Sequence, residues 1–212
     1  MREYMDAYLL KNKFMPYPDY LLERWKQGDY SMLTRSNASD YIKEILVHKA
    51  ETRPGKRFFG EAYIASRIDM VQGWYNSFKW LTADKWITGN GLEPRFEKPF
   101  HVALMQNIGK DLLYNLQAKA AAFYNEYKEK YKEGGQHKKP VAPDLWIIDK
   151  NGNFIFIESK LPGDSIQPHQ IAGMALIKKH LEACAQVSVS IITLYPENFD
   201  PKSLFTELYA LA

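Results

Sequence analysis

The chain has 212 residues, of which 46% are hydrophobic and 25% are charged, and this composition excludes an intrinsically disordered protein. Lys and Arg number 28 and Asp and Glu number 25, so the net charge is +3, which is too small to identify a polyanionic partner by itself. A single cysteine, Cys184, excludes both a disulfide framework and a CxxC-type zinc site within one chain.

The charge pattern also bears on membranes and secretion. Residues 1–25 carry charges throughout and have no long apolar core, so we expect that they do not form a signal peptide. No apolar run approaches the ~20 residues that a membrane-spanning helix requires. We therefore expect a soluble, intracellular protein of the cytoplasm with no membrane partner.

Residues 1–55 are predicted to form a helical N-terminal arm, made of helical segments that Pro16 and Pro18 interrupt. Within residues 41–50 the apolar side chains recur on one helical face, and either Ser39 or Asp40 can cap that helix. The sequence leaves three roles for the arm open: a packing arm, a dimer contact or a clamp on a substrate.

Residues 58–87 are predicted to form two helices joined at Gly73. The aromatic residues of 74–86 favour a buried core over a platform for stacking nucleic-acid bases, because large rings dominate protein cores. Residues 88–94 have the composition of a turn. The GNG within this turn lacks the preceding strand and the later glycine of a dinucleotide loop, so we expect no nucleotide cofactor.

Residues 101–133 show a long helical pattern with a charged end, which Gly134-Gly135 terminates. This pattern predicts a helical insertion, about residues 88–140, within a second unit that spans residues 56–212. The charges near the end of the helix alternate in sign, a pattern that favours a solvated face over a DNA-binding role.

From residue 141 the pattern changes to strands. Two short apolar runs joined by Asn151-Gly152 predict a β-hairpin, and a helix, an alternating strand and a closing helix follow. These predicted elements cover residues 145–149, 153–160, 168–184, 186–195 and 200–212. The sequence therefore predicts an α/β fold, a mixed β-sheet flanked by helices, with a large helical N-terminal part.

Charged residues follow apolar ones on one face of the second predicted strand. Because side chains alternate along a strand, the face that carries Phe156 also carries Glu158 and Lys160. Lys160 can pair with Glu158 for structural reasons alone, since a buried charge without a partner is costly. The hairpin can also fold Asp144 back toward Glu158, and two converging carboxylates suit Mg²⁺, which takes one or two protein carboxylates. A metal, a water and a nearby lysine are what phosphodiester hydrolysis needs.

Pro143-Asp144 followed by Glu158-Ser159-Lys160 resembles the signature of the PD-(D/E)xK nuclease superfamily. Residues 158–170, ESKLPGDSIQPHQ, are similar to the EVKxPxDRLSxxQ stretch of VRR-NUC (virus-type replication-repair nuclease) domains. The resemblance implies a restriction-endonuclease-like core with the element order α-β-β-β-α-β, whose last four elements residues 141–195 supply. Ser159 stands where the family usually has an apolar residue, Ser165 stands where arginine is common, and no first strand is evident.

The resemblance also implies roles for the residues of the site. Asp144 and Glu158 would be metal ligands, the backbone carbonyl of Ser159 would be a further ligand, and the metal would be Mg²⁺ or Mn²⁺. Lys160 would be the catalytic lysine. Gln170 would help to order the water or the lysine.

Superfamily members often add an acid from the first core helix to the site. Glu61, in the predicted helix that begins near residue 58, is the candidate here. A glutamate in a first helical turn also interacts favourably with the helix dipole, so both interpretations of Glu61 stay open.

Five basic residues are candidates for contact with DNA phosphates. Lys178 and Lys179 lie on the predicted helix that follows the ESK motif, and Arg53, Lys56 and Arg57 lie in a basic loop. Each of them can equally be a solvated surface cation.

Together these features predict a metal-dependent nuclease that hydrolyses phosphodiester bonds of DNA, as an endonuclease in repair, replication or phage and defence biology. The resemblance adds the expectation of a homodimer, since small stand-alone relatives tend to dimerise. Two alternatives stay open: a catalytically inactive nucleic-acid-binding or assembly module on a nuclease-like fold, and a different metal-dependent phosphodiesterase or RNA-processing enzyme.

Overall fold

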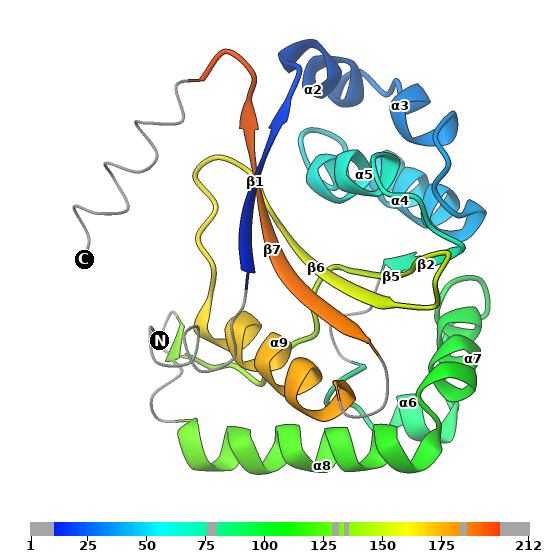
Figure 1. The fold of residues 1–212 in the computed structure, drawn as a ribbon, viewed down its shortest axis with the longest axis vertical. Coiled ribbons are helices and arrows are strands. Elements are labelled where there is room, and N and C mark those ends of the chain that lie inside the picture. Colours follow the sequence, from blue (N-terminus) through cyan, green and yellow to red (C-terminus); the bar gives the residue numbers. More distant parts are fainter. Residues whose placement is uncertain (1–10, 76–79, 129–131, 134–135, 183–185, 200–212) are drawn as a thin grey trace.

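The computed structural model describes residues 11–75, 80–128, 132–133, 136–182 and 186–199. In these residues five strands form one mixed β-sheet with helices on both faces (Figure 1). In spatial order the strands are β1 (Lys11–Tyr17), β7 (Val187–Pro196), β6 (Phe154–Lys160), β5 (Leu145–Ile148) and β2 (Gln72–Tyr75). The predicted α/β class, with a mixed sheet flanked by helices, is confirmed.

The helices form two groups on opposite faces of the sheet (Figure 1). The first group is α2 (Asp19–Lys26), α3 (Ser31–Thr34), α4 (Asp40–Thr52) and α5 (Phe59–Ser66). The second is α6 (Lys85–Thr88), α7 (Glu97–Asn107), α8 (Lys110–Tyr127) and α9 (Pro168–Leu181). A small antiparallel pair, β3 (Lys132–Glu133) and β4 (Gln136–His137), follows α8. Within the described residues, no helix has the length and apolar character needed to cross a membrane.

Alternation along the strands divides the apolar core in two. In β5 the side chains of Leu145 and Ile147 pack with the first group of helices, whereas Trp146 packs with the second. In β6 Ile157 likewise faces the first group, and Phe156 faces the second and stacks on Trp146. The central strands are therefore buried on both faces, as their near-continuous apolar sequences require.

The N-terminal residues contain a strand where helix was expected. β1 pairs in parallel with β7 at the edge of the sheet, so residues 11–17 are not part of a helical arm. Pro16 has no N–H to donate, and an edge strand tolerates proline for that reason. The helices that follow agree with the prediction, and Ser39 caps α4 by accepting a hydrogen bond from the backbone N–H of Ile42.

The prediction of a second helix within residues 58–87 is wrong. α5 is present, but residues 72–75 form β2, which runs antiparallel to β5. Gly73 is not a joint between helices: it pairs with Ile147 in the sheet, and its carbonyl accepts a hydrogen bond from the Ser39 hydroxyl. Trp74, Trp80 and Trp86 are buried in the core, which confirms the structural interpretation of these aromatic residues.

The single long helix predicted over residues 101–133 is two helices. α7 ends at Asn107, and α8 begins after Gly109, whose φ of 82° is left-handed and breaks the helical path. The β5–β6 hairpin, α9 and β7 agree with the prediction. The predicted closing helix over 200–212 lies outside the described residues.

Candidate active site

The β5–β6 hairpin brings two carboxylates together at one end of the sheet. Leu145 pairs with Ile157, so the register places the preceding Asp144 opposite Glu158. The backbone N–H of Ser159 donates a hydrogen bond of 3.0 Å to Asp144 Oδ2. At the other end of the hairpin, the Asp149 carboxylate accepts hydrogen bonds from the backbone N–H groups of Asn151 and Asn153, which fixes the turn and therefore this register.

Three charged side chains at this end of the hairpin are almost fully buried. Asp144 is 6% exposed, Glu158 is 1% exposed and Lys160 is 9% exposed. Charged residues of this kind are rarely so buried unless they are paired. Their partners therefore decide what the cluster can do.

Lys160 and Gln170 hold one oxygen of Glu158. The Lys160 ammonium lies 2.9 Å from Glu158 Oε1 and donates to Gln170 Oε1 at 3.0 Å. The Gln170 amide nitrogen donates to the same Glu158 oxygen. These contacts show that Lys160 and Glu158 leave β6 on one face, the face that α9 covers (Figure 1).

The other oxygen of Glu158 is unusual. Among the described residues, Glu158 Oε2 is buried and accepts no hydrogen bond of normal geometry, although the backbone N–H and the carboxyl group of Asp144 lie close enough to oppose the rise that burial causes in the pKa of Glu158. A buried oxygen of an ionised carboxylate without a donor costs free energy, and this one lies in the cluster that Asp144 shares. Oε2 is therefore the atom of the cluster at which a bound proton or cation would remove an energetic cost.

The start of α9 positions Gln170. Pro168 occupies the first turn of the helix, and Gln170 takes part in a capping box in which its Oε1 accepts a hydrogen bond of 2.9 Å from the Gln167 backbone N–H. The His169 carbonyl also accepts a hydrogen bond from the Val141 backbone N–H, which ties α9 to the segment before Asp144. The Gln170 side chain thus caps α9 and also holds the Glu158–Lys160 pair.

Helix α5 brings Glu61 to the cluster from the other face of the sheet. Gly60 makes this approach possible, because a Cβ atom at residue 60 would lie 2.3 Å from the Ser159 hydroxyl. Glu61, in the next position, keeps some exposed surface as a whole residue, but its carboxyl group is largely removed from water. This burial, together with the negative charges of Glu158 and Asp164, raises the pKa of Glu61 to about 7.

The other two carboxyl groups are shifted in the same direction. Burial and then the charges of Glu158 and Glu61 raise the pKa of Asp144 well above its usual range. Burial also raises the pKa of Glu158, although the Lys160 ammonium opposes that effect. Three acids that resist ionisation in one place mark a functional-site candidate, and either protons or a cation would relieve their repulsion.

The candidate DNA-binding residues lie in two separate places. Lys178 and Lys179 occupy the last turn of α9, and the eight residues that separate Lys178 from Gln170 correspond to roughly 12 Å of helix. Arg53 is the C-cap residue of α4, and Lys56 and Arg57 are exposed in the loop before α5. Arg53 lies close enough to the Tyr75 hydroxyl to act on it electrostatically, as Glu61 and Asp144 do, and contact of all five cations with DNA stays a prediction.

Sequence reasoning missed two residues of the site. Tyr75 ends β2 opposite Leu145, and burial followed by the charges of Glu61 and Asp144 raises the pKa of its hydroxyl well above the usual value. The sequence does not indicate Tyr75 because the pattern around residues 72–75 predicts helix and not strand. Asp164 acts on Glu61 electrostatically and accepts a hydrogen bond from the Leu161 backbone N–H. Its position in Pro162-Gly163-Asp164, within the stretch that resembles VRR-NUC domains, was the feature of the sequence that could have indicated a role in the site.

The donors that a metal ion could use are few. Among the described residues, no group of three or more His, Cys, Asp and Glu side chains is placed to hold a metal ion. Asp144 and Glu158 remain as a converging pair of carboxylates. No family model, curated protein or solved structure matches the chain.

Proposed function

We propose that the protein is a metal-dependent nuclease that hydrolyses phosphodiester bonds of DNA as an endonuclease. The observation that carries this proposal is the buried Glu158, which has one oxygen held by Lys160 and Gln170 and the other oxygen, beside Asp144, without a hydrogen bond of normal geometry. This arrangement costs stability unless a ligand completes it, because the acids are desolvated and lie close to one another.

A divalent cation fits the donors that are present. Mg²⁺ binds oxygen ligands, keeps several of its waters and needs only one or two protein carboxylates, so the pair Asp144 and Glu158 is sufficient. Glu158 Oε2 would be a ligand atom, and Asp144 would contribute the oxygen that does not accept the Ser159 N–H. The carbonyl of Ser159 stays a predicted ligand. When bound, the cation would supply a Lewis acid that lowers the pKa of a coordinated water.

The side chains around the carboxylates have separate tasks in this proposal. Lys160 would place its ammonium where negative charge develops on the phosphate, and its hydrogen bonds to Glu158 and Gln170 hold it there before the substrate arrives. Gln170 would act as a positioning residue through Lys160 and Glu158. Glu61 would hold a proton at its carboxyl group near neutral pH, where it can exchange that proton with water.

The order of the elements also supports a restriction-endonuclease-like core. The chain runs α5, β2, β5, β6, α9 and β7, which is the order α-β-β-β-α-β that the PD-(D/E)xK resemblance implies. In this scheme β2 is the first strand that the sequence did not reveal, and α6, α7, α8 and the small β3–β4 pair are inserted between the first and second strands.

The main alternative is an inactive nucleic-acid-binding or assembly module. It is favoured by the complete set of hydrogen bonds around Glu158 Oε1, which lets Lys160 and Glu158 serve as a structural ion pair. In that case the carboxylates would not need a cation.

Cleavage of labelled nucleic acid separates the two functions. Single-stranded, duplex, flapped and four-way-junction DNA, and the matching RNA, would be incubated with Mg²⁺, Mn²⁺ or EDTA. We expect wild-type protein to cut DNA only with a metal, Lys160→Gln to be inactive but folded, and Lys150→Gln to be fully active. Lys150 is the control because it is an exposed lysine in the turn at the other end of the hairpin. Cutting that survives in EDTA or in Lys160→Gln would refute the catalytic assignment.

A further inference from the structure

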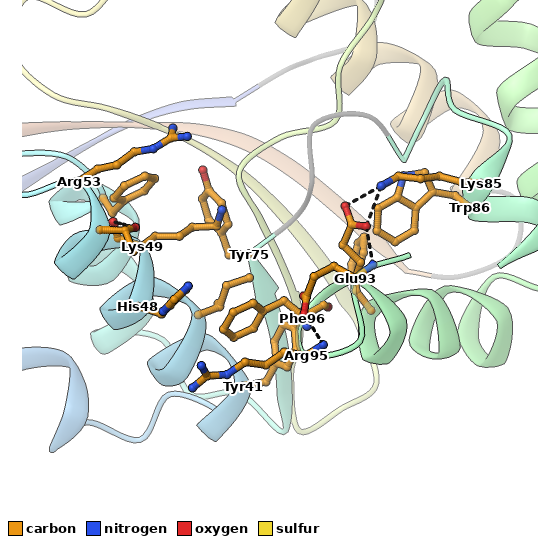
Figure 2. A pocket seen from close by; sticks show the side chains of 15 residues that line it. Tyr41, His48, Lys49, Arg53, Tyr75, Lys85, Trp86, Glu93, Arg95 and Phe96 are labelled. Carbon is orange, nitrogen blue, oxygen red and sulfur yellow. Dashed lines mark hydrogen bonds and ion pairs between the residues drawn. The ribbon is translucent and has the colours of Figure 1, made fainter. Parts of the chain in front are cut away.

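A large pocket lies next to the carboxylate cluster but does not include it. Its volume is about 880 Å³, within the range of ligand-binding sites. One wall is α4 and the other comprises α6, residues 93–96 and the start of α7, with β2 between them (Figure 2). Arg53 and the Tyr75 hydroxyl lie at one end of the pocket, and Tyr41 and Arg95 lie at the other (Figure 2).

The wall formed by α4 supplies positive charge. Tyr41, Ile45, His48, Lys49 and Thr52 line the pocket and follow one face of the helix, since their spacing is three or four residues. Lys49 places its ammonium over the Tyr75 ring, 5.3 Å from the ring centroid. Among the described residues, neither Lys49 nor Arg53 forms a salt bridge, so both charges are available to a ligand.

The acids of the opposite wall are already bound. Glu97 accepts hydrogen bonds from Lys85 and from the Glu93 backbone N–H. Glu93 accepts hydrogen bonds from the backbone N–H groups of Arg95 and Phe96. Four Lys or Arg side chains and two Glu side chains line the pocket, and Arg95 pairs with Glu44 outside it. The formal charge of the lining and this partner is therefore 4 − 3 = +1, which suits an anionic ligand.

Aromatic rings form much of the remaining surface. The rings of Tyr41, His48, Phe58 and Phe96 are half-buried and line the pocket. Phe58 is the one described non-glycine residue with a positive φ, 63°, a conformation that costs about 1–3 kcal/mol in a bulky residue. That backbone brings the Phe58 ring edge-on to Tyr75, with 5.9 Å between ring centroids.

The pocket adjoins the candidate site through two of these residues. Tyr75 pairs in the sheet with Leu145, the residue after Asp144. Phe58 directly precedes α5, which carries Glu61. A DNA strand whose phosphate lies at the carboxylates therefore has a cationic, ring-lined pocket beside it.

We infer that this pocket binds an unpaired nucleotide of the strand that is cleaved, with Lys49 and Arg53 at its phosphate and Phe58 beside its base. This inference rests on the proposed nuclease function, which puts the strand at the adjoining carboxylates. Ring stacking with cations on the backbone is how proteins hold single strands. A base within a duplex is covered by its neighbours on both faces, so only an unpaired base can enter, and substrates with a single-stranded element near the cut are favoured.

Binding measured in EDTA tests the pocket separately from catalysis. Fluorescence anisotropy at one salt concentration would compare a blunt duplex, the same duplex with a short single-stranded extension, and that extension with abasic nucleotides. We expect wild-type protein to bind the extension more tightly than the blunt duplex. The abasic extension should bind about tenfold more weakly than the intact one, the scale of one lost base–aromatic stack.

Three variants assign the interactions. Phe58→Asn removes the ring while asparagine tolerates the left-handed backbone, and it should abolish the difference between intact and abasic extensions. The double variant Lys49→Gln/Arg53→Gln should weaken binding of the extension about tenfold and leave the blunt duplex unchanged. Lys150→Gln should change neither the affinity for the extension nor the affinity for the blunt duplex.

Equal losses of affinity for the extension and the duplex, or no loss in any pocket variant, would overturn the inference. Failure of the nuclease proposal would show instead as wild-type protein that binds DNA without cutting it in Mg²⁺ or Mn²⁺.

Discussion

The two ends of β6 place side chains on the same face of the sheet but have opposite chemistry. At one end Phe156 is fully buried and stacks on Trp146; at the other, Glu158 and Lys160 are buried to a similar degree. Burial of Phe156 stabilises the fold, because apolar area leaves water. Burial of the charged pair is nearly neutral at best once desolvation is counted. The strand therefore has one end that stabilises the fold and another end whose buried charges require a different explanation.

The largest expected effect is at the polar end and concerns activity. Glu158→Gln keeps the shape of the side chain but removes the charge that would hold a cation. We expect cleavage with Mg²⁺ to fall about a thousandfold, which corresponds to several kcal/mol of lost transition-state stabilisation. Rates of DNA cleavage would be compared with circular dichroism of the same samples. A folded variant with the wild-type rate would remove Glu158 from the mechanism.

Substitutions at the apolar end of β6 should lower the stability of the fold. Phe156→Ala leaves a cavity beside Trp146 in the core cluster that both residues share, and it should lower the free energy of unfolding by about 3–5 kcal/mol. Phe154→Ala, on the same face but only half-buried, is the matched control and should cost less. Denaturant titration measures both. If the two substitutions cost the same, Phe156 is not the structural anchor of this strand.

The contact between α5 and β6 can be broken directly. In Gly60→Ala the new methyl group would meet the Ser159 hydroxyl, 2.3 Å away, and such overpacking costs about 1–3 kcal/mol. It should also move Glu61 away from the other acids and slow cleavage. Adding Ser159→Ala removes the clash and should restore both stability and rate. Equal behaviour of the single and double variants would mean that α5 does not approach β6 in this way.

The smallest expected effect concerns pH. The pKa of Glu61 is about 7 in the folded protein and about 4.3 in an unfolded chain. The stability that this group contributes is therefore complete below pH ~4.3 and is lost as the pH rises through about 7. In EDTA, wild-type protein should lose stability between those values. The full difference in pKa corresponds to about 3.7 kcal/mol, but Glu61 keeps some exposed surface and water screens its charge in part, so Glu61→Gln should be more stable at pH 8 by about 1–2 kcal/mol. Thermal unfolding at several pH values, with the exposed Glu182→Gln as control, measures this; parallel profiles for wild type and Glu61→Gln would contradict it.

Local patterns predicted the β5–β6 hairpin, α9 and β7, because their turns and apolar alternation are contained in short stretches of sequence. β1 and β2 were not predicted. β1 carries two lysines and a proline, β2 has only four residues including Gly73, and both are strands because of their pairing with β7 and β5. Such pairing depends on residues far away in the chain, so propensity within the segment is a weak guide.

The same distinction holds for the site. Asp144, Glu158 and Lys160 could be placed together because a hairpin with a known turn fixes their register. Gln170 came from the resemblance, and its capping role appeared only with the helix. Tyr75 was missed along with its strand. The approach of Glu61 depends on the close packing of Gly60 in α5 against Ser159 in β6, a contact that no local pattern in the sequence reveals.

The most direct test of the central claim, that the carboxylates at the polar end of β6 hold a divalent cation, is thermal unfolding at pH 8 with increasing Mn²⁺. A ligand that binds only the folded state raises the midpoint with concentration. We predict such a rise for wild-type protein, and its loss in Asp144→Asn/Glu158→Gln. A wild-type midpoint that does not change with Mn²⁺, or an equal rise in the variant, would contradict the account.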